Sequence, residues 1–544
     1  MRHHFIMPNG GVICKSLTGS GSQQKPFMMP NRSADILFQL IKSLEKAEKR
    51  HFKLYIKRSS GREELKIVRL FDVLDKQKDY DEQGLLKKMP GVTKPQLANL
   101  KSHLYKQVMA SLRLLKSTDS LDLQLNEQFD YAHILYKKGL FLQSLRIIER
   151  AKEIARANQK FNFLPQLIAL EKRIENLHIT RSMQDRAELL SAEANEVSRH
   201  IDMVARLSNL ALRLYSWYVE HGHARNEEDE KDVRQFMKDN LTPDTQKQTG
   251  FYERLYLYQS YTWYAFIRQD FLQYYRYTKK WVDLFAEQPL MIRVETGHYI
   301  KGLHNLLNAH FDLRNYRQFE KTLRQLEKLA QTDRVKDHDS FRIQAFIYTS
   351  TAKINQHFMQ GTFKQGLSLI PGIEEKLAGY HLFIDNHRIL VLNYKFAMLC
   401  FGSGDYKRSI DYLQRIIHDK TSLRYDLQCY ARLLHLMAHY ELGNDMLMES
   451  LTKSVYRFMA KMKNLTAVEE AMFKFLRQSI PLSPRQLKPE LEKFLHTIKH
   501  LEKNRFQTRS FAYLDIISWV ESKVYNKPMG TVIQEKYLQS KRKK

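Results

Sequence analysis

The sequence predicts an all-α protein built from an array of helical hairpins. Glycine and proline, the residues that most often interrupt helices, occur only 20 and 13 times in 544 residues. The chain is 43% apolar and 11% aromatic, which is enough to bury a large core and excludes a chain that is disordered throughout. A pattern of small and aromatic residues also recurs about every 45 residues, as in stacked helical units.

Cysteine usage and the lack of long apolar runs predict a cytoplasmic protein that does not enter a membrane. Cys14, Cys400 and Cys429 are too few and too widely spaced for a disulfide framework or a thiolate zinc site. No window holds the roughly 18 uninterrupted apolar residues of a membrane span, and the amino terminus lacks the apolar core of a signal peptide.

The net charge of +28 is concentrated at the two ends of the chain. Residues 1–120 hold 23 lysines and arginines against 11 acids, and residues 484–544 hold 14 against 6. Basic modules therefore flank a less charged middle. Such an excess favours an anionic partner, of which nucleic acid is the commonest.

Residues 1–33 are expected to form a flexible tail ahead of the first helix. The composition before Met28 is unusual, so a translation start at Met1 and one at Met28 or Met29 both stay open. We assign no fold to this segment.

Residues 34–58 are predicted to form one long amphipathic helix. Its apolar side consists of Leu37, Ile41, Leu44, Phe52 and Tyr55, of which the last four lie within about 60° of Leu37 at 100° per residue. The opposite side carries six cations with no acid between them for i,i+4 pairing. We call this set the basic stripe: Lys42, Lys46, Lys49, Arg50, Lys53 and Lys57. At roughly 22 Å it is long enough to contact several phosphates, and an ordinary solvated face is the alternative.

The remainder of the basic module, which as a whole spans residues 34–118, is predicted to hold a short helix, a turn at Pro90 and Gly91, and a long helix opened by Thr93. This order is also that of a DNA-binding helix-turn-helix. The residues that would read DNA are Lys94, Gln96, Asn99 and Lys101. Two antiparallel helices that cap a helical array have the same pattern, so both interpretations stay open.

Two stretches of the middle region align with each other, YAHILYKKGLFLQSLRIIERA and FAMLCFGSGDYKRSIDYLQRII. The shared positions are Ala132 and Ala397, Gly139 and Gly404, Phe141 and Tyr406, and Ser144 and Ser409. Further copies are marked by the aromatic residues Phe271, Tyr316 and Phe363, and weaker copies lie near Met183, Ala224 and Asp445. Because Gly402–Lys407 lacks the G-x-x-x-x-G-K-[ST] spacing and follows a helical pattern, we interpret it as a helix corner and not as a phosphate-binding loop.

This pattern resembles the tetratricopeptide repeat, with a glycine at the turn and small residues where the two helices cross. The resemblance implies a right-handed α-solenoid of about eight tetratricopeptide-like hairpins over residues 119–483, with extended repeats of about 41–47 residues. Helical caps are expected on either side, at residues 484–530 on the carboxyl side, followed by a basic tail over 531–544. The amino-terminal module also resembles the start of uncharacterised repeat proteins of Bacteroidota, a similarity that brings no activity with it.

One position of each good copy holds an aromatic ring, which we call the aromatic ladder: Tyr136, Phe266, Phe311, Phe358 and Phe401. Regular rings at helical spacing usually pack neighbouring helices, and the alternative is a groove for a peptide. In tetratricopeptide repeats the first helix lines the concave surface. The resemblance therefore implies a peptide groove at two further positions, which are not needed for packing: Gln259, Trp263, His304, Asn308, Thr351, Asn355, Tyr394 and Met398.

Sequence motifs of catalysis are missing from the chain. It contains no H-E-x-x-H, no G-x-S-x-G, no dinucleotide fingerprint and no Cys or His metal spacing. His221 and His223 lie beside an acidic loop that could take a metal adventitiously, although a solvated loop is the simpler interpretation. We expect a protein that is not an enzyme and needs no cofactor.

These observations predict a non-catalytic scaffold or adaptor that receives a protein or peptide segment on the concave face of a solenoid. The alternative is a nucleic-acid-binding regulator that uses the basic stripe and the carboxy-terminal KYLQSKRKK, with the solenoid as a sensing arm. The two hypotheses differ in salt dependence, because phosphate contacts weaken steeply with salt and an apolar groove does not. The oligomeric state is left open.

Overall fold

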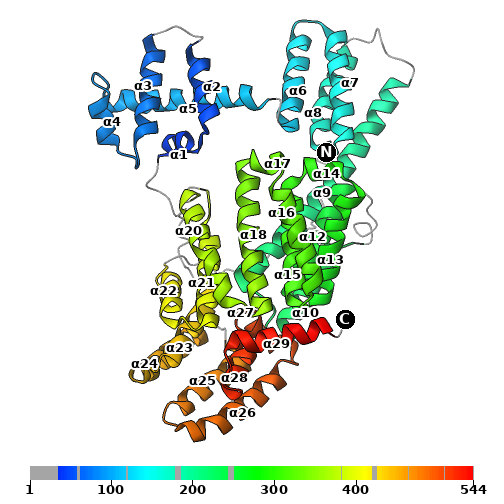
Figure 1. Ribbon diagram of the computed structural model, residues 1–544. Helices are drawn as coiled ribbons and strands as arrows, with labels where there is room; N and C mark the ends of the chain where they lie inside the picture. The colour runs from blue at the N-terminus through cyan, green and yellow to red at the C-terminus, as the bar shows by residue number, and fades with distance from the viewer. Residues whose placement is uncertain are drawn as a thin grey trace, which may run out of the picture. The chain divides into compact units, whose positions relative to one another are not determined.

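A computed structural model describes residues 35–57, 62–117, 120–177, 185–242, 250–380, 383–419, 425–462, 465–507 and 509–542. The expected amino-terminal tail, the repeat marker Met183 and the last two lysines lie outside these residues. Every regular element of the described ranges is a helix, which confirms the all-α class (Figure 1). The chain divides into two compact units, Met1–Ser117 and Thr118–Lys544.

The first unit holds five helices within its described residues: α1 (Ile36–Ser43), α2 (Lys46–Lys57), α3 (Arg62–Lys76), α4 (Glu82–Lys88) and α5 (Lys94–Lys116). Its core gathers apolar residues from all five, with the rings of Phe52 and Phe71 packed 4.7 Å apart. Lys101 on α5 ties the unit together, because it pairs with Asp35 before α1 and donates a 2.8 Å hydrogen bond to the Tyr80 hydroxyl.

The prediction of a single helix over residues 34–58 is wrong. Leu44 adopts extended backbone with ψ of 134°, so α1 ends at Ser43 and α2 starts three residues later, at Lys46. Helical periodicity alone does not reveal this break, because Leu37, Ile41 and Leu44 are all buried, as they would be along one apolar face of a continuous helix. The predicted helix start at Thr93 is confirmed, with a capping box between Thr93 and Gln96.

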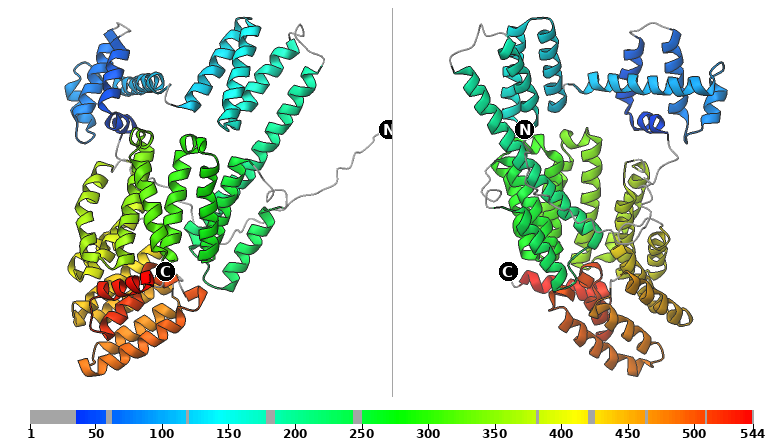
Figure 2. Two further views of the ribbon diagram at one scale, coloured as in Figure 1. Left: turned by 45° about the vertical axis from the view of Figure 1, so that its right-hand side comes forward. Right: turned by 180° about the vertical axis from the view of Figure 1, so that it is seen from behind.

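The second unit begins with α6 (Leu121–Lys137), α7 (Phe141–Ala157), η1 (Phe161–Phe163), α8 (Leu164–Leu177), α9 (Arg186–His221) and α10 (Glu227–Asn240). It continues with α12 (Phe251–Ile267), α13 (Phe271–Glu287), α14 (Leu290–Val294), α15 (Thr296–Asp312), α16 (Tyr316–Ala330), α17 (Asp333–Lys336) and α18 (Asp339–Gln360). Most of the long helices pack on the next long helix in sequence, whereas α9, which runs as one continuous rod, packs on α12 (Figure 2).

The carboxy-terminal part comprises α19 (Phe363–Gly366), η3 (Leu367–Leu369), α20 (Ile370–Gly379), α21 (Asn386–Ser403), α22 (Tyr406–Ile417), α23 (Tyr425–Glu441) and α24 (Asp445–Lys461). The remaining helices are α25 (Ala467–Ser479), α26 (Pro484–Leu501), η4 (Arg505–Gln507), α27 (Arg509–Tyr513), α28 (Ile516–Val524) and α29 (Met529–Arg542). Much of the stretch expected as a basic tail therefore lies in α29.

The hairpin turns repeat one backbone geometry. Positive φ occurs two residues before each of the five aromatic markers, at Gly139, Gln269, Arg314, Gly361 and Gly404. The marker is in each case the first residue of the second helix. Gly404 takes φ of 90° in the left-handed region at the end of α21, which confirms the interpretation of Gly402–Lys407 as a helix corner.

A second feature recurs in the two stretches that align best. The Ser144 hydroxyl donates to the Ala132 carbonyl at 2.8 Å, and the Ser409 hydroxyl donates to the Ala397 carbonyl at 2.9 Å. Both serines and both alanines are fully buried. The small residues therefore bring the two helices of a hairpin close enough for a direct hydrogen bond between them.

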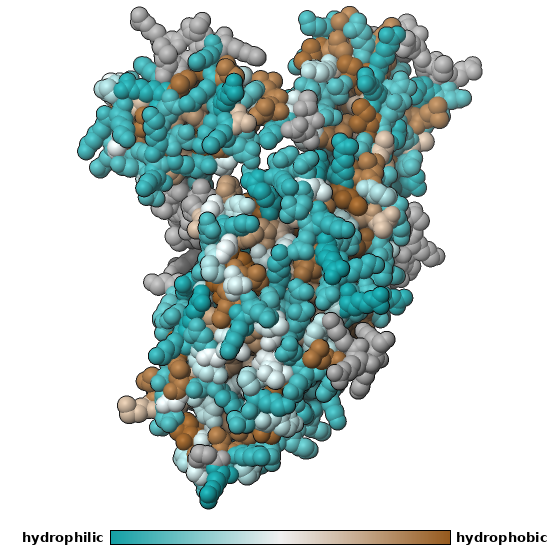
Figure 3. Space-filling view, viewed as in Figure 1, coloured by the Kyte–Doolittle hydropathy of each residue, from teal (hydrophilic) through white to brown (hydrophobic). Residues whose placement is uncertain are grey.

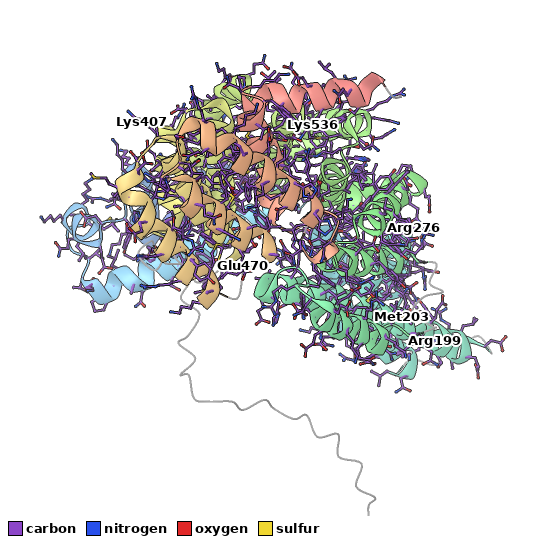
Figure 4. The ribbon with its side chains drawn as sticks, turned by 90° about the horizontal axis from the view of Figure 1, so that it is seen from below. Arg199, Met203, Arg276, Lys407, Glu470 and Lys536 are labelled. Carbon is purple, nitrogen blue, oxygen red and sulfur yellow. The ribbon has the colours of Figure 1, made fainter. Side chains whose placement is uncertain are left out.

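The carboxy-terminal segment folds back on earlier helices. Helix α29 packs on α18 and α21, and the Tyr316 and Tyr537 rings lie 4.6 Å apart (Figure 1). A Cβ on Gly361 would lie far inside contact distance of the Gly530 carbonyl oxygen, so the two backbones cross without room for a side chain. Lys536, labelled in Figure 4, donates a 2.9 Å hydrogen bond to Ser518 and links α29 to α28.

The face of the molecule drawn in Figure 3 is mainly hydrophilic, with apolar residues in separate patches. Within the described residues no helix combines the length and the apolar character needed to cross a bilayer.

Candidate binding surfaces

The basic stripe is partly neutralised by α3. The Lys49 ammonium lies 2.6 Å from an Asp75 carboxylate oxygen, and Lys53 lies 2.7 Å from Asp72. Lys42 donates to the Asp75 carbonyl oxygen at 2.6 Å. Lys46, Arg50 and Lys57 are exposed and form no ion pair with another described residue. No acid lies between the six cations for i,i+4 pairing, but α3 supplies carboxylates to two of them and a backbone carbonyl to a third.

The residues proposed to read DNA serve the unit's own structure for the most part. Lys94 pairs with Glu82 at 3.3 Å, and the Gln96 side chain accepts from the Thr93 amide as part of the helix cap. Lys101 is held by Asp35 and Tyr80. Asn99 alone of the four is exposed with no contact of this kind in the described part of the chain.

The eight predicted groove residues lie on the first helices of successive hairpins, which we call the A-row: α12, α15, α18 and α21. Four of them are buried, namely Gln259, Thr351, Asn355 and Tyr394, at 5%, 7%, 3% and 4% exposure. The assumption that these positions are not needed for packing is wrong for this half. The Tyr394 hydroxyl donates to the Tyr513 carbonyl at 3.1 Å, so α27 covers it.

The other four, Trp263, His304, Asn308 and Met398, are half-buried. Trp263 lies beside the exposed Tyr215 of α9, with ring centroids 5.0 Å apart. His304 stacks flat on Tyr348 of α18 at 3.8 Å, and the Asn308 side chain is 3.3 Å from its Nε2. These contacts hold the rings and amides in fixed positions along one surface of the A-row, which we call the A-row face.

Three cations that the sequence analysis did not single out belong to the same face: Lys301 on α15, and Arg388 and Lys395 on α21. The Lys395 ammonium donates to the Asn355 side-chain oxygen at 2.6 Å, and it lies 5.6 Å from the Phe358 ring centroid. Lys301 lies 5.8 Å from the Tyr215 ring centroid. Helical spacing could have found two of them, because Lys301 precedes His304 by three residues and Lys395 precedes Met398 by three.

The electrostatics of the A-row face reflect burial of positive charge. Burial lowers the pKa of Lys395 to about 8, with Asp312 acting in the opposite direction. Burial, with the charges of Lys395, Lys301 and Arg388, lowers the pKa of His304 to about 3. Burial also raises the pKa of Asp312 to about 7. His304 is therefore neutral at physiological pH, and the three cations all act on the same imidazole.

The aromatic ladder packs inside its own hairpins. Phe401 lies 5.3 Å from the marker Tyr406, Phe358 lies 6.0 Å from Phe363, and Tyr136 lies 5.8 Å from Phe141. Three rungs of the ladder, together with Tyr513, Trp519 and Met529 of the carboxy-terminal segment, line an apolar cavity of about 50 Å³. These rungs are thus covered by the chain itself and are not an open groove.

A polar cavity of about 320 Å³ lies between α16 and α18. Its lining mixes both signs of charge, and Lys353 pairs with Glu327 across it at 2.9 Å. The two histidines beside the acidic loop are separated by their contacts, since His223 is buried 2.8 Å from the Phe266 carbonyl and His221 stacks on Trp217.

Neither a scan against protein-family models nor a search of curated proteins returned a match to this chain, so the resemblance to repeat proteins rests on its own residues.

Proposed function

We propose that this chain is a non-catalytic binding protein in which a right-handed solenoid of about eight tetratricopeptide-like hairpins presents the A-row face to a segment of a partner protein. The recurring turn geometry two residues before each aromatic marker supports the repeat assignment. So does the paired serine-to-alanine hydrogen bond, because it requires the same close crossing in two distant hairpins.

The observation that carries the function is the row of half-buried aromatic and polar groups on consecutive helices. Trp263 comes from α12, His304 and Asn308 from α15, and Tyr348 from α18. Rings held in place by stacking lose little conformational freedom when a ligand binds, so their contacts convert efficiently into affinity. Asn308 and the neutral His304 supply hydrogen-bonding groups that suit a peptide backbone.

A library of random 12-residue peptides panned against the full chain tests this proposal. Peptides enriched on the wild type should lose at least tenfold in affinity, roughly 1.4 kcal/mol, when Trp263→Ala removes the central ring. Tyr215→Ser, on the exposed ring beside it, should weaken the same peptides. Tyr525→Ala is the matched control, because Tyr525 is 55% exposed at the C-cap of α28, outside the A-row face. Enrichment that is equal for all four proteins contradicts the proposal.

Nucleic-acid binding through the basic stripe is kept as the second candidate because Lys46, Arg50 and Lys57 stay exposed. With Lys42, Lys49 and Lys53 engaged by α3, the stripe offers about three cations to phosphates and not six. This makes it the weaker of the two candidates.

A further inference from the structure

We propose that the A-row face of α15, α18 and α21 binds a phosphate monoester group among Lys301, Lys395 and Arg388. This inference deepens the proposed function and rests on it, because it names the chemistry that the A-row face recognises.

The first argument is that two of these cations lack acidic partners. Lys301 and Lys395 are half-buried, and neither forms an ion pair with another residue in the described ranges. Among the described residues Arg388 pairs with Asp385 alone, one turn before it at 3.2 Å. Lys301 and Lys395 contact neutral groups instead, the Asn355 amide and the rings of Tyr215 and Phe358.

Several other buried cations of the second unit have acidic partners, whereas the half-buried Arg432 contacts the neutral Gln428 side chain, the Ile417 carbonyl and the Phe458 ring. Lys152 lies 2.8 Å from Glu171 and 2.6 Å from Glu193. Arg268 pairs with the buried Glu230 at 2.8 Å. Because a desolvated cation without a counter-ion costs folding free energy, an uncompensated group of this kind is typical of a site that receives an anion.

The second argument concerns the charge and shape of the ligand. Two ammonium groups and a guanidinium exceed what one carboxylate neutralises, whereas a phosphate monoester carries close to two charges at pH 7 and three acceptor oxygens. Asp312, whose charge acts on Lys395, has its pKa raised to about 7 by burial, so it is only partly ionised at pH 7 and compensates Lys395 only in part. A guanidinium such as that of Arg388 also matches phosphate oxygens with two parallel donors.

Neutral donors on the same face complete the site. The Asn308 amide donates to Nε2 of the neutral His304, which leaves the proton of that imidazole on Nδ1 as a second donor. The stack of His304 on Tyr348 fixes the orientation of the ring. The geometry therefore offers cations and directed N–H groups together, as phosphate sites do.

Calorimetric titration of the full chain with inorganic phosphate and with O-phosphoserine, at constant ionic strength, tests the inference. Acetate serves as the singly charged comparison. The decisive variant carries Lys301→Met and Lys395→Met, and Lys407→Met is the control because Lys407 is an exposed lysine at the periphery of α22 (Figure 4). We expect inorganic phosphate and O-phosphoserine to bind the wild type and the Lys407→Met control with equal affinity, and to bind both far more tightly than acetate does. The double variant should bind both phosphates at least tenfold more weakly.

Titration of a peptide with and without one phosphoserine identifies the source of the group. A gain on phosphorylation that the double variant loses assigns the phosphate to a protein segment, and tight binding of free phosphoserine without such a gain assigns it to a small molecule. Equal affinity of the wild type and the double variant, or no binding of either phosphate, overturns the inference. That result would leave the Trp263-dependent panning untouched, so failure of this site and failure of the proposed function are distinguishable.

Discussion

The basic stripe and the A-row face carry cations in opposite circumstances. In the stripe, six cations are conspicuous in the sequence, and half of them are engaged by the carboxyl end of α3 through Asp72 and Asp75. On the A-row face, Lys301, Arg388 and Lys395 are dispersed over almost 100 residues of sequence, yet all three act on His304. The difference teaches that the density of charge along a sequence is a poor guide to a binding site, because pairing in the fold decides which charges are left for a ligand.

The largest loss of stability is expected where two segments distant in sequence pack together in the second unit. Gly361→Val places a β-branched side chain at φ of 69° against the backbone of Gly530, and should cost about 3 kcal/mol or more by forcing α29 off α18. Hydrogen exchange should then lose protection in residues 529–542 while residues 35–116 are unchanged. Gly372→Ala, with open space around its Cβ, is the control and should be neutral or stabilising. Retained protection of α29 would show that the crossing tolerates a side chain.

The second prediction concerns the loss of an ion pair in the first unit. Lys101→Met removes the partner of Asp35 and of the Tyr80 hydroxyl, leaving a largely buried carboxylate without its cation. The first unit should lose about 2 kcal/mol of unfolding free energy, measured by chemical denaturation. Lys106→Met, on an exposed face of α5, should change stability by less than about 0.5 kcal/mol. Equal effects of the two substitutions would contradict the role of the pair.

Lys395→Met is expected to stabilise the folded protein, in contrast to Lys101→Met, which is expected to destabilise it. Burial lowers the pKa of Lys395 from the ordinary lysine value of 10.5 to about 8 in the folded protein, so folding disfavours the charged form below about pH 8. Its removal should raise the unfolding free energy at pH 7 by about 1 kcal/mol, once the lost hydrogen bond to Asn355 is included.

This gain has a definite pH dependence. Between about pH 8 and 10.5 the unfolded chain binds more protons at Lys395 than the folded chain does, so wild-type stability rises with pH there and the advantage of the variant disappears. Thermal unfolding of the wild type and of Lys395→Met at pH 7 and pH 10 measures this difference in stability. A variant that is destabilised at pH 7 would show that Lys395 is compensated after all.

The smallest effect concerns the basic stripe. Changing Lys46, Arg50 and Lys57 to glutamine should lower the dependence of nucleic-acid affinity on salt by at most about three units of logarithmic slope, because only these three are free of α3. Fluorescence anisotropy of a labelled RNA of about 20 nucleotides and of a DNA duplex, at about 50 and 200 mM salt, measures the slope. No salt-dependent binding by the wild type would remove the stripe as a nucleic-acid surface.

Local patterns in the sequence determined much about this protein. They identified the all-α class, the helix start at Thr93 and the corner at Gly404, because helix formation, capping and positive φ depend on residues within a few positions of each other. They also identified the five aromatic markers, each of which is the first residue of a second helix in the structure. The ligand of the protein is not set by any of these local rules.

Only the tertiary structure decided which side chains remain open to a partner. The break at Leu44, the acids of α3 opposite the stripe and the cover of α27 over Tyr394 all involve residues brought together by packing. Half of the predicted groove was consequently buried, while Lys301 of α15 and Arg388 and Lys395 of α21 all act on His304, a proximity between separate helices that helical spacing does not describe. The physical reason is that burial and ion pairing depend on distance in space, which a helical period describes within one helix and not between helices.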